Sequence, residues 1–203
     1  MKAKCLMLDV DGVLVFGRPS DGQHWMTGLL DDLGISPSEL AQSFFRAEWN
    51  NVVVGRKELL PTLQEALGHI APSARAEDLI AYWFEMSSRI IQPVLSDVRE
   101  ARNQGTPVYL ATNQDHSRAD YLMHTMGLRD EVDGIVYSAK AGYQKPDARF
   151  YSFAENATGY RPDELIMVDD KLENVEAAKA SGWLAVHWFG SEGLSAILQR
   201  SIA

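Results

Sequence analysis

Cysteine is almost absent from this sequence, and long apolar runs are missing. The 203 residues include one cysteine, Cys5, so an internal disulfide is excluded. Because Cys5 lies within an apolar stretch, we expect a buried thiol. No stretch reaches the roughly 18 consecutive apolar residues that a membrane helix needs, and the N-terminal apolar run is too short for a signal peptide. We therefore expect a cytoplasmic protein with no membrane partner.

Positive charge is also scarce. Lys and Arg total 19 against 28 Asp and Glu, which gives a net charge of −9. Nucleic-acid backbones attract basic surfaces, so we expect no nucleic-acid partner. A small anionic ligand is still allowed, because a few local cations and a metal ion reverse the sign of charge at a site. The sequence is silent on oligomeric state.

Four short apolar runs predict strands. They lack alternation, which is typical of parallel strands buried on both faces. Helical patterns separate the later runs, so the sequence predicts an α/β fold with a doubly wound parallel sheet. The predicted strands are Cys5–Leu8, Val108–Ala111, Leu165–Val168 and Trp183–Phe189, and the predicted helices are Asp115–Gly127, Pro146–Thr158, Leu172–Ser181 and one that carries Leu194, Ile197, Leu198 and Ile202.

The region from about Phe16 to Ile91 has helical periods and no convincing strand. Ser36–Glu39 matches a capping box with proline at the first helical position. The ambiguous spot is Val52–Val54. We predict a helical domain at residues 16–91, inserted into a core domain formed by residues 1–15 and 92–203. An apolar stripe with helical spacing lies in its last part, at Leu79, Tyr82, Trp83, Met86 and Ile90.

Polar residues follow three of the predicted strands at the point where each strand ends. Open α/β sheets bind ligands beyond the carboxyl ends of their strands. Each group alone also fits a turn or a helix cap. The groups are Asp9 and Asp11, Thr112 and Asn113, and Asp169 and Asp170, joined by the stretch from Gln144 to Asp147 in the loop before a helix.

Taken together, these residues predict a site for a phosphoryl group. Converging carboxylates repel one another unless a cation joins them, and a set of oxygen ligands suits Mg²⁺. No Cys/His cluster is present, which argues against zinc. With Pro146 at the first position of a helix, Lys145 would face the positive end of the helix dipole, so it is easier to understand beside carboxylates or an anion. A metal with a carboxylate, a hydroxyl and a lysine supplies the charge neutralisation that phosphoryl transfer needs.

Four stretches, in order, resemble the motifs of the haloacid dehalogenase-like (HAD) hydrolase superfamily. The branch is the one with a helical cap after the first motif, the C1-type, subfamily IA-like phosphatases. The resemblance implies a Rossmann-like core with an inserted α-helical cap and a Mg²⁺-dependent phosphatase acting on a small phosphorylated metabolite. The stretches are DVDGVL (Asp9–Leu14), ATN (Ala111–Asn113), KPDARFY (Lys145–Tyr151) and VDDKLENVEAAKASG (Val168–Gly182).

The same resemblance implies catalytic roles. Asp9 would be the nucleophile that forms an aspartyl-phosphate, since a carboxylate is already ionised at pH 7. Asp11 would protonate the leaving oxygen and then deprotonate the attacking water. Thr112 and Asn113 would hydrogen-bond the phosphoryl oxygens, with Asn113 acting through its backbone or its side chain. Lys145 would neutralise the phosphoryl group and orient Asp9.

The implied metal ligands for Mg²⁺ are acidic. Asp170 would be the main ligand of the last motif, and Asp169 a second or water-mediated one. Asp9 and the main-chain carbonyl of Asp11 would complete the set. Asn174 is either a residue that supports these ligands or an ordinary exposed helix position.

In this family the cap closes over the site and selects the substrate. Arg56 follows Gly55 and resembles the specificity loop of related caps, so it is the first candidate for substrate contact. Trp49 and Trp83 have the spacing of core residues. A helical cap of this size favours sugar phosphates or phosphoglycolate-like acids. The other cap candidates are Arg18, His24, Trp25, Arg46, Trp49 and Lys57.

Three alternatives remain open. A phosphomutase would use the same motifs and transfer the phosphoryl group to a sugar hydroxyl. A 2-haloacid dehalogenase is disfavoured by Asp11, because the family's dehalogenases lack this second aspartate. A non-catalytic binding protein is disfavoured by the intact carboxylates and Lys145, since clustered carboxylates are costly to keep.

Overall fold

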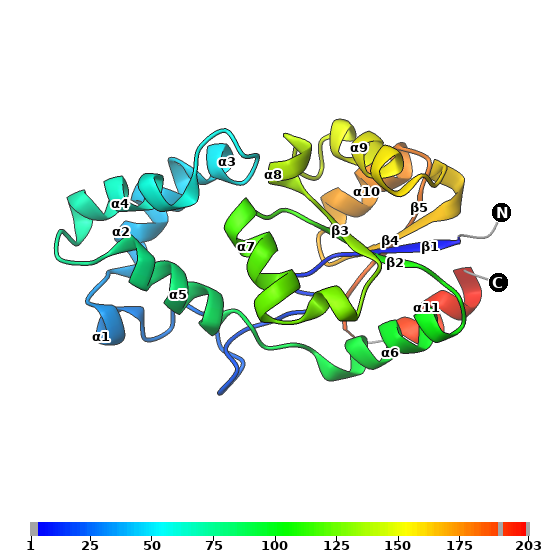
Figure 1. Cartoon of the computed structure of the whole chain (residues 1–203), viewed down its shortest axis with the longest axis horizontal. Coiled ribbons are helices and arrows are strands. Elements are labelled where there is room, and N and C mark those ends of the chain that lie inside the picture. Colours follow the sequence, from blue (N-terminus) through cyan, green and yellow to red (C-terminus); the bar gives the residue numbers. More distant parts are fainter. Residues whose placement is uncertain (1–3, 191–192, 202–203) are drawn as a thin grey trace.

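The computed structural model describes residues 4–190 and 193–201, and these form two parts (Figure 1). One part is a five-stranded parallel sheet with helices on both faces, and helices α1 to α5 lie together beside it. The strand order is β3-β2-β1-β4-β5. The predicted doubly wound α/β fold with an inserted helical cap is confirmed. The strands are β1 (Cys5–Leu8), β2 (Val108–Thr112), β3 (Gly134–Tyr137), β4 (Leu165–Asp169) and β5 (Leu184–His187).

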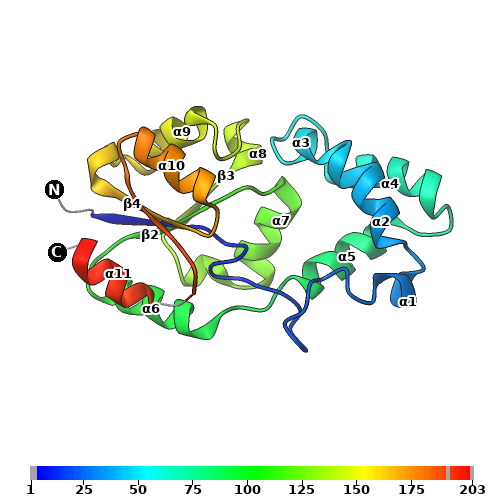
Figure 2. The ribbon, with the colours of Figure 1, turned by 180° about the vertical axis from the view of Figure 1, so that it is seen from behind.

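The central strand β1 is covered on both faces because successive side chains point to opposite sides of a sheet. Leu6 and Leu8 pack in the cluster that includes residues of α6 (Gln92–Asn103) and α11 (Leu194–Ser201). Cys5 and Met7 pack on the other face in a cluster with residues of α9 (Ala148–Thr158) and α10 (Leu172–Ala180), which the view from behind also shows (Figure 2). The Cys5 thiol is buried, as predicted.

Agreement with the predicted strands is best at the centre of the sheet. β1 has the predicted bounds, and β2 and β4 each extend one residue further, to Thr112 and Asp169. β3 was not predicted, because only two apolar residues lie between its glycine and its tyrosine. β5 is shorter than predicted and partly exposed, since it is an edge strand with β4 on one side alone.

The four predicted core helices are present, with differences at their ends, whereas α6 was not predicted. The predicted helix at Asp115–Gly127 is α7 (His116–Asp120) followed by a π-helical turn (Tyr121–Thr125), and Asp115 caps it. The helix predicted from Pro146 begins instead at Ala148, because the Asp147 carboxylate accepts a hydrogen bond from Arg149 N and caps it. Lys145 therefore does not sit at the first helical turn. Ile202 lies outside the described residues.

The helical cap has its own apolar cluster. Ser36 Oγ accepts a hydrogen bond from Glu39 N at 3.4 Å, and Pro37 is the first helical residue, as predicted. The apolar stripe ends at Met86, because Ile90 lies beyond α5 and forms a β-bridge. The cap elements are α1 (Leu29–Leu33), α2 (Pro37–Leu40), a π-helical turn (Ala41–Arg46), α3 (Trp49–Val52), α4 (Leu59–Ile70) and α5 (Ala76–Met86), so that Val53 and Val54 lie in the turn after α3.

Two adjacent segments connect the cap to the core. Phe16 N donates to Arg89 O at 3.0 Å, and Ile91 N donates to Leu14 O at 2.9 Å. The domain boundaries predicted at 15/16 and 91/92 fall in this pair of segments, and the division into domains stays a prediction. No described helix combines the length and the apolar character that crossing a bilayer requires.

Arg118 and Ser138 of the core bind the cap away from these connections. The buried Arg118 of α7 reaches the end of α5, where Nη1 donates to Phe84 O at 3.0 Å and Nη2 donates to Ser87 O. Its guanidinium also lies over the Phe84 ring, 5.1 Å from the centroid. At the opposite side, Ser138 of α8 (Ser138–Ala141) donates from Oγ to Val53 O at 2.6 Å.

Candidate active site

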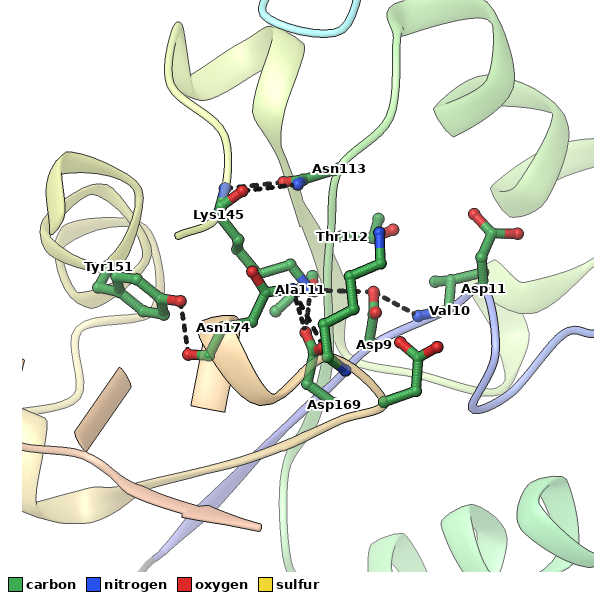
Figure 3. A network of polar contacts seen from close by, with 12 residues as sticks. Asp9, Val10, Asp11, Ala111, Thr112, Asn113, Lys145, Tyr151, Asp169 and Asn174 are labelled. Atoms are coloured by element: carbon green, nitrogen blue, oxygen red, sulfur yellow. Dashed lines mark hydrogen bonds and ion pairs between the residues drawn. The ribbon is translucent and has the colours of Figure 1, made fainter. Parts of the chain in front are cut away.

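The predicted site residues gather at the carboxyl edge of the sheet (Figure 3). Register aligns Leu8 of β1 with Leu110 of β2 and Val168 of β4, so the residues just beyond them lie side by side. The structure thus brings Asp9, Thr112 and Asp169 together from three strands. All three are buried, although Asp9 keeps 6% of its surface exposed.

Lys145 joins these strands through its ammonium group. Nζ lies 3.0 Å from Asp9 Oδ1 and 2.6 Å from Asp169 Oδ2, and it donates to Ala111 O at 2.6 Å. Burial alone would lower the pKa of Lys145, but the carboxylates of Asp9 and Asp169 outweigh it and raise that pKa above its ordinary value. Lys145 therefore carries its charge while buried, as its predicted neutralising role requires.

Asn113 fixes the loop that carries Lys145. Its Nδ2 donates to Lys145 O at 2.9 Å, and its Oδ1 accepts from Lys145 N at 2.8 Å (Figure 3). The sequence predicted that Asn113 contacts the phosphoryl group by side chain or backbone. The side-chain carbonyl and one amide N–H of Asn113 are thus engaged with Lys145, which leaves the backbone and the second N–H of Nδ2 for a phosphoryl contact.

The charge of Asp9 depends on its neighbours. The pKa of Asp9 is raised to about 7, because burial, with a contribution from the Asp169 carboxylate, outweighs the opposing effect of Lys145. From the sequence, an ordinary pKa and full ionisation at pH 7 were expected for this carboxylate. A further cation beside Lys145 would favour the ionised form of Asp9.

The residues present fit such a cation. Asp9, Asp169 and Asp170 each offer a carboxylate oxygen within 4.8 Å of the other two. Oδ1 of Asp170 is buried and has no hydrogen-bond partner among the described residues. Burial raises the pKa of Asp170, and the Asp169 carboxylate raises it further. A hard divalent cation such as Mg²⁺ satisfies oxygen ligands of this kind.

Close approach to Asp170 explains the glycine after Asp11. A Cβ at Gly12 would lie 2.4 Å from Asp170 Oδ2, and Gly12 has a φ of 89°, which side-chain-bearing residues rarely adopt. The Asp11 side chain is exposed and does not belong to the carboxylate group formed by Asp9, Asp169 and Asp170. Its predicted metal contact was through the main-chain carbonyl.

Asn174 supports Asp169 from the first turns of α10. Its Nδ2 lies 3.0 Å from each carboxylate oxygen of Asp169, and the residue is 2% exposed. The alternative of an ordinary exposed helix position is therefore wrong. Tyr151, which the sequence reasoning missed, donates from Oη to Asn174 O at 2.8 Å (Figure 3). Tyr151 lies in the KPDARFY stretch, which was the available signal.

Gln114 is a second residue that sequence reasoning missed. Its Nε2 donates to Asp11 Oδ2 and lies 3.3 Å from Thr112 Oγ1. Gln114 is buried, whereas Asp11 is exposed. The amide thus holds the Asp11 carboxylate in one orientation beside Thr112. Its place directly after Asn113 was the signal that could have found it.

A cavity of about 720 Å³ opens above these residues, between the sheet edge and the cap. Of the seven cap candidates, His24, Trp25 and Trp49 line it. Arg56 does not: it is exposed in the turn after α3, where its N donates to Asn51 O. The structure therefore does not bring Arg56 to the site as predicted. Arg18, Arg46 and Lys57 are also absent from the cavity lining.

Known proteins resemble this chain along most of its length. A model of the haloacid dehalogenase-like hydrolase family matches residues 3–182. The chain belongs to this family. A sesquiterpene phosphatase from Aspergillus oryzae is 33% identical to this HAD-like hydrolase over 195 residues, which cover 91% of the chain and 89% of the relative.

A phosphoglycolate phosphatase from Pseudomonas putida is 26% identical, with 88% of this HAD-like hydrolase and 66% of the relative covered. Among solved structures, a HAD family enzyme from Bacteroides thetaiotaomicron, crystallised with magnesium and inorganic phosphate, superposes with a TM-score of 0.80 at 17% identity, covering 96% of this chain and 98% of that one. At that identity the likeness shows the fold alone. Together with its phosphatase relatives, family membership identifies this HAD-like hydrolase as an enzyme of the phosphatase type.

Proposed function

We propose that the protein is a Mg²⁺-dependent phosphatase that hydrolyses a small phosphate monoester through an aspartyl-phosphate on Asp9. The observation that carries the proposal is the contact between Asp9 and the buried Lys145, beside a buried Asp170 oxygen that has no hydrogen-bond partner within residues 4–190 and 193–201. The names of the relatives support phosphate ester hydrolysis, and they differ in the organic group.

In the first step, Asp9 displaces the alcohol. Oδ1 of Asp9 is held by Lys145 and by the Val10 N–H, at 3.0 Å and 2.8 Å, which leaves Oδ2 to attack phosphorus. The new bond joins this oxygen to phosphorus as the bond to the ester oxygen breaks. Asp11 gives its proton to the departing oxygen, so an alcohol leaves.

In the second step, Asp11 acts as a base. It takes a proton from a water molecule, and the resulting hydroxide attacks phosphorus and releases the Asp9 carboxylate and inorganic phosphate. Gln114 keeps the Asp11 carboxylate aimed at the same place for both steps. Lys145 offsets negative charge on the phosphoryl group, and the Thr112 hydroxyl and Asn113 would donate hydrogen bonds to its oxygens.

The Asp9 and Asp170 carboxylates would hold Mg²⁺, with Asp169 beside them and the Asp11 main-chain carbonyl as a further ligand. When bound, the ion neutralises phosphoryl charge and favours the ionised form of Asp9. No observation favours the phosphomutase or dehalogenase alternatives.

The direct test is phosphate release from an aryl phosphate with and without Mg²⁺. Release that requires the metal supports the proposal. Release of halide from a 2-haloacid, or conversion between glucose phosphates without free phosphate, would replace it.

Asp170→Asn is expected to abolish the response to Mg²⁺. A ligand that binds only the folded state stabilises it, by about 2.7 kcal/mol at a hundredfold excess over Kd, and so raises the melting temperature. Thermal unfolding of EDTA-treated protein should shift upward with added Mg²⁺ in the wild type and stay unchanged in the variant. Asp130→Asn removes an exposed carboxylate elsewhere and should keep the full shift. An equal shift in both variants would remove Asp170 from the metal ligands.

Gln114→Met is expected to lower kcat about tenfold to a hundredfold, because it removes a hydrogen bond to a charged group worth about 1.5–3 kcal/mol. KM should change little, since Asp11 acts on the leaving oxygen and on water. Gln144→Met is the matched control, because Gln144 also lines the cavity but bonds to Asn50 at 3.4 Å. Equal kcat values in the two variants would contradict a role for Gln114 in positioning Asp11.

A further inference from the structure

We infer that the substrate is the phosphate monoester of a long, uncharged hydrocarbon alcohol, whose hydrocarbon part binds an aromatic wall of the cap. The inference rests on the proposed function, which places the phosphate at Asp9. The aromatic wall consists of Trp25, Phe45, Trp49 and Trp83, and all four side chains line the cavity.

The aromatic wall is continuous. The Trp83 ring lies 5.3 Å from Trp25, 5.3 Å from Phe45 and 5.5 Å from Trp49, measured between centroids. Its members come from the loop before α1, the π-helical turn, α3 and α5. Folding of the cap therefore gathers rings that are far apart in the sequence onto one side of the cavity.

The aromatic wall is more than the surface of the cap's interior. Trp25 is 8% exposed, whereas Phe45, Trp49 and Trp83 are half-buried and keep ring surface open to the cavity. Phe16, which is 54% exposed, also lines the cavity and extends its apolar surface. Binding of a hydrocarbon to apolar surface in a concave site is favourable, because it removes that surface from water.

The cap offers almost no polar partner to an organic group. Its polar side chains in the cavity lining are His24 and Ser87. Arg18 is bound to Asp21, and Lys57 is paired with Glu48 at 2.7 Å, and neither lines the cavity. The other polar lining residues, among them Arg118 and Gln144, come from the core. A sugar or a second carboxylate against the cap would therefore lose hydration with few matching partners there, which is costly.

The opposite side of the cavity is charged. Asp11, Lys145 and Asp170 lie there, with Lys171 and Glu173 nearby in the lining. One end thus fits a phosphate with its metal ion, and the other fits hydrocarbon. A volume of about 720 Å³ is in the range that holds a ligand much larger than a two-carbon acid.

The test is the chain-length dependence of kcat/KM for n-alkyl monophosphates from ethyl to decyl, each below its micelle concentration. Each added methylene should raise kcat/KM about fourfold until the cavity is full, from about 0.8 kcal/mol per buried CH₂. Glucose 6-phosphate and phosphoglycolate should fall at or below ethyl phosphate. A flat series, or a preference for either polar substrate, would overturn the inference.

Variants connect the chain-length effect to the aromatic wall. Trp49→Ser should lower the decyl-to-ethyl ratio of kcat/KM at least tenfold. Phe189→Ser removes another exposed aromatic ring, one outside the cavity lining, and should keep the wild-type ratio. Equal ratios in the two variants would place the hydrocarbon away from the aromatic wall.

Binding separates this inference from the proposed function. Alkylphosphonates have no ester bond to hydrolyse, and three of the five tryptophans line the cavity, so their fluorescence reports occupancy in the wild-type protein. Tighter binding of decylphosphonate than of ethylphosphonate supports the inference even if no ester is hydrolysed. Asp9-dependent hydrolysis of an aryl phosphate, combined with equal affinity for the two phosphonates, overturns the inference and leaves the phosphatase standing.

Discussion

Asp9→Asn is expected to abolish phosphate release, by a factor on the order of 10⁴ or more, as for the loss of other covalent nucleophiles. An amide cannot form the mixed anhydride with phosphate. The measurement is release from an aryl phosphate at saturating Mg²⁺, with wild type and variant side by side. The fold should stay intact, because the asparagine Oδ1 still accepts hydrogen bonds from Lys145 and from the Val10 N–H.

The matched control for this variant is Asp31→Asn, which alters an exposed carboxylate on α1. It should keep wild-type turnover. Circular dichroism and thermal unfolding check that both variants are folded. If Asp9→Asn retained more than a trace of activity, another group would be the nucleophile and the two-step scheme would be wrong.

Lys145→Met is expected to remove activity and also to destabilise the protein by about 3–5 kcal/mol, which is the usual cost of removing one partner from a buried ion pair. Two carboxylates, Asp9 and Asp169, would lose the ammonium that lies between them. The measurement is urea unfolding in metal-free buffer, where the midpoint should fall sharply with an unchanged slope.

Two further variants make this result specific. Lys140→Met removes an exposed lysine on α8 and should shift stability by less than about 0.5 kcal/mol. Adding Asp169→Asn to Lys145→Met should recover part of the lost stability, because one of the unpaired charges disappears. Additive losses in the double variant would show that the ammonium does not stabilise Asp169.

The centre of the sheet was predictable from sequence, and its edges were less so. β1 and β4 are buried along their whole length, so their apolar runs are uninterrupted. β3 and β5 each pair on one side and keep partly exposed residues, which shortens the apolar signal. The start of α9 was displaced by two residues, since a proline and an aspartate both suit a helix beginning and the aspartate cap prevailed.

The position of the site could be predicted because parallel strands end at one edge. Asp9, Thr112 and Asp169 meet there for that reason. The direction of each side chain could not be predicted, because it depends on neighbours distant in sequence. Asn113 binds the Lys145 backbone, and Gln114, in the loop after β2, reaches Asp11 beyond the end of β1.

The cap was harder to interpret from its sequence. Helical spacing indicated that Trp49 and Trp83 belong to a core, and both do pack against the cap's apolar cluster. They also line the cavity, which spacing along one helix cannot reveal. Arg56 was placed by motif likeness, yet the turn that carries it presents Gly55 to the core instead, where an added Cβ would lie 2.6 Å from Ala139 O.

The cap is fastened to the core unequally at its two sides. Movement of α3 away from the core would break the hydrogen bond from Ser138 to Val53 and the 3.4 Å contact between Gln144 and Asn50. Movement of α5 away from Arg118 would instead leave a buried guanidinium without its hydrogen bonds to Phe84 O and Ser87 O and without its contact with the Phe84 ring. If the cap opens, we therefore expect α3 to separate from α8 of the core while α5 stays beside Arg118 of α7 (Figure 1). On that geometry we expect Trp49, on α3, to move further than Trp83, on α5.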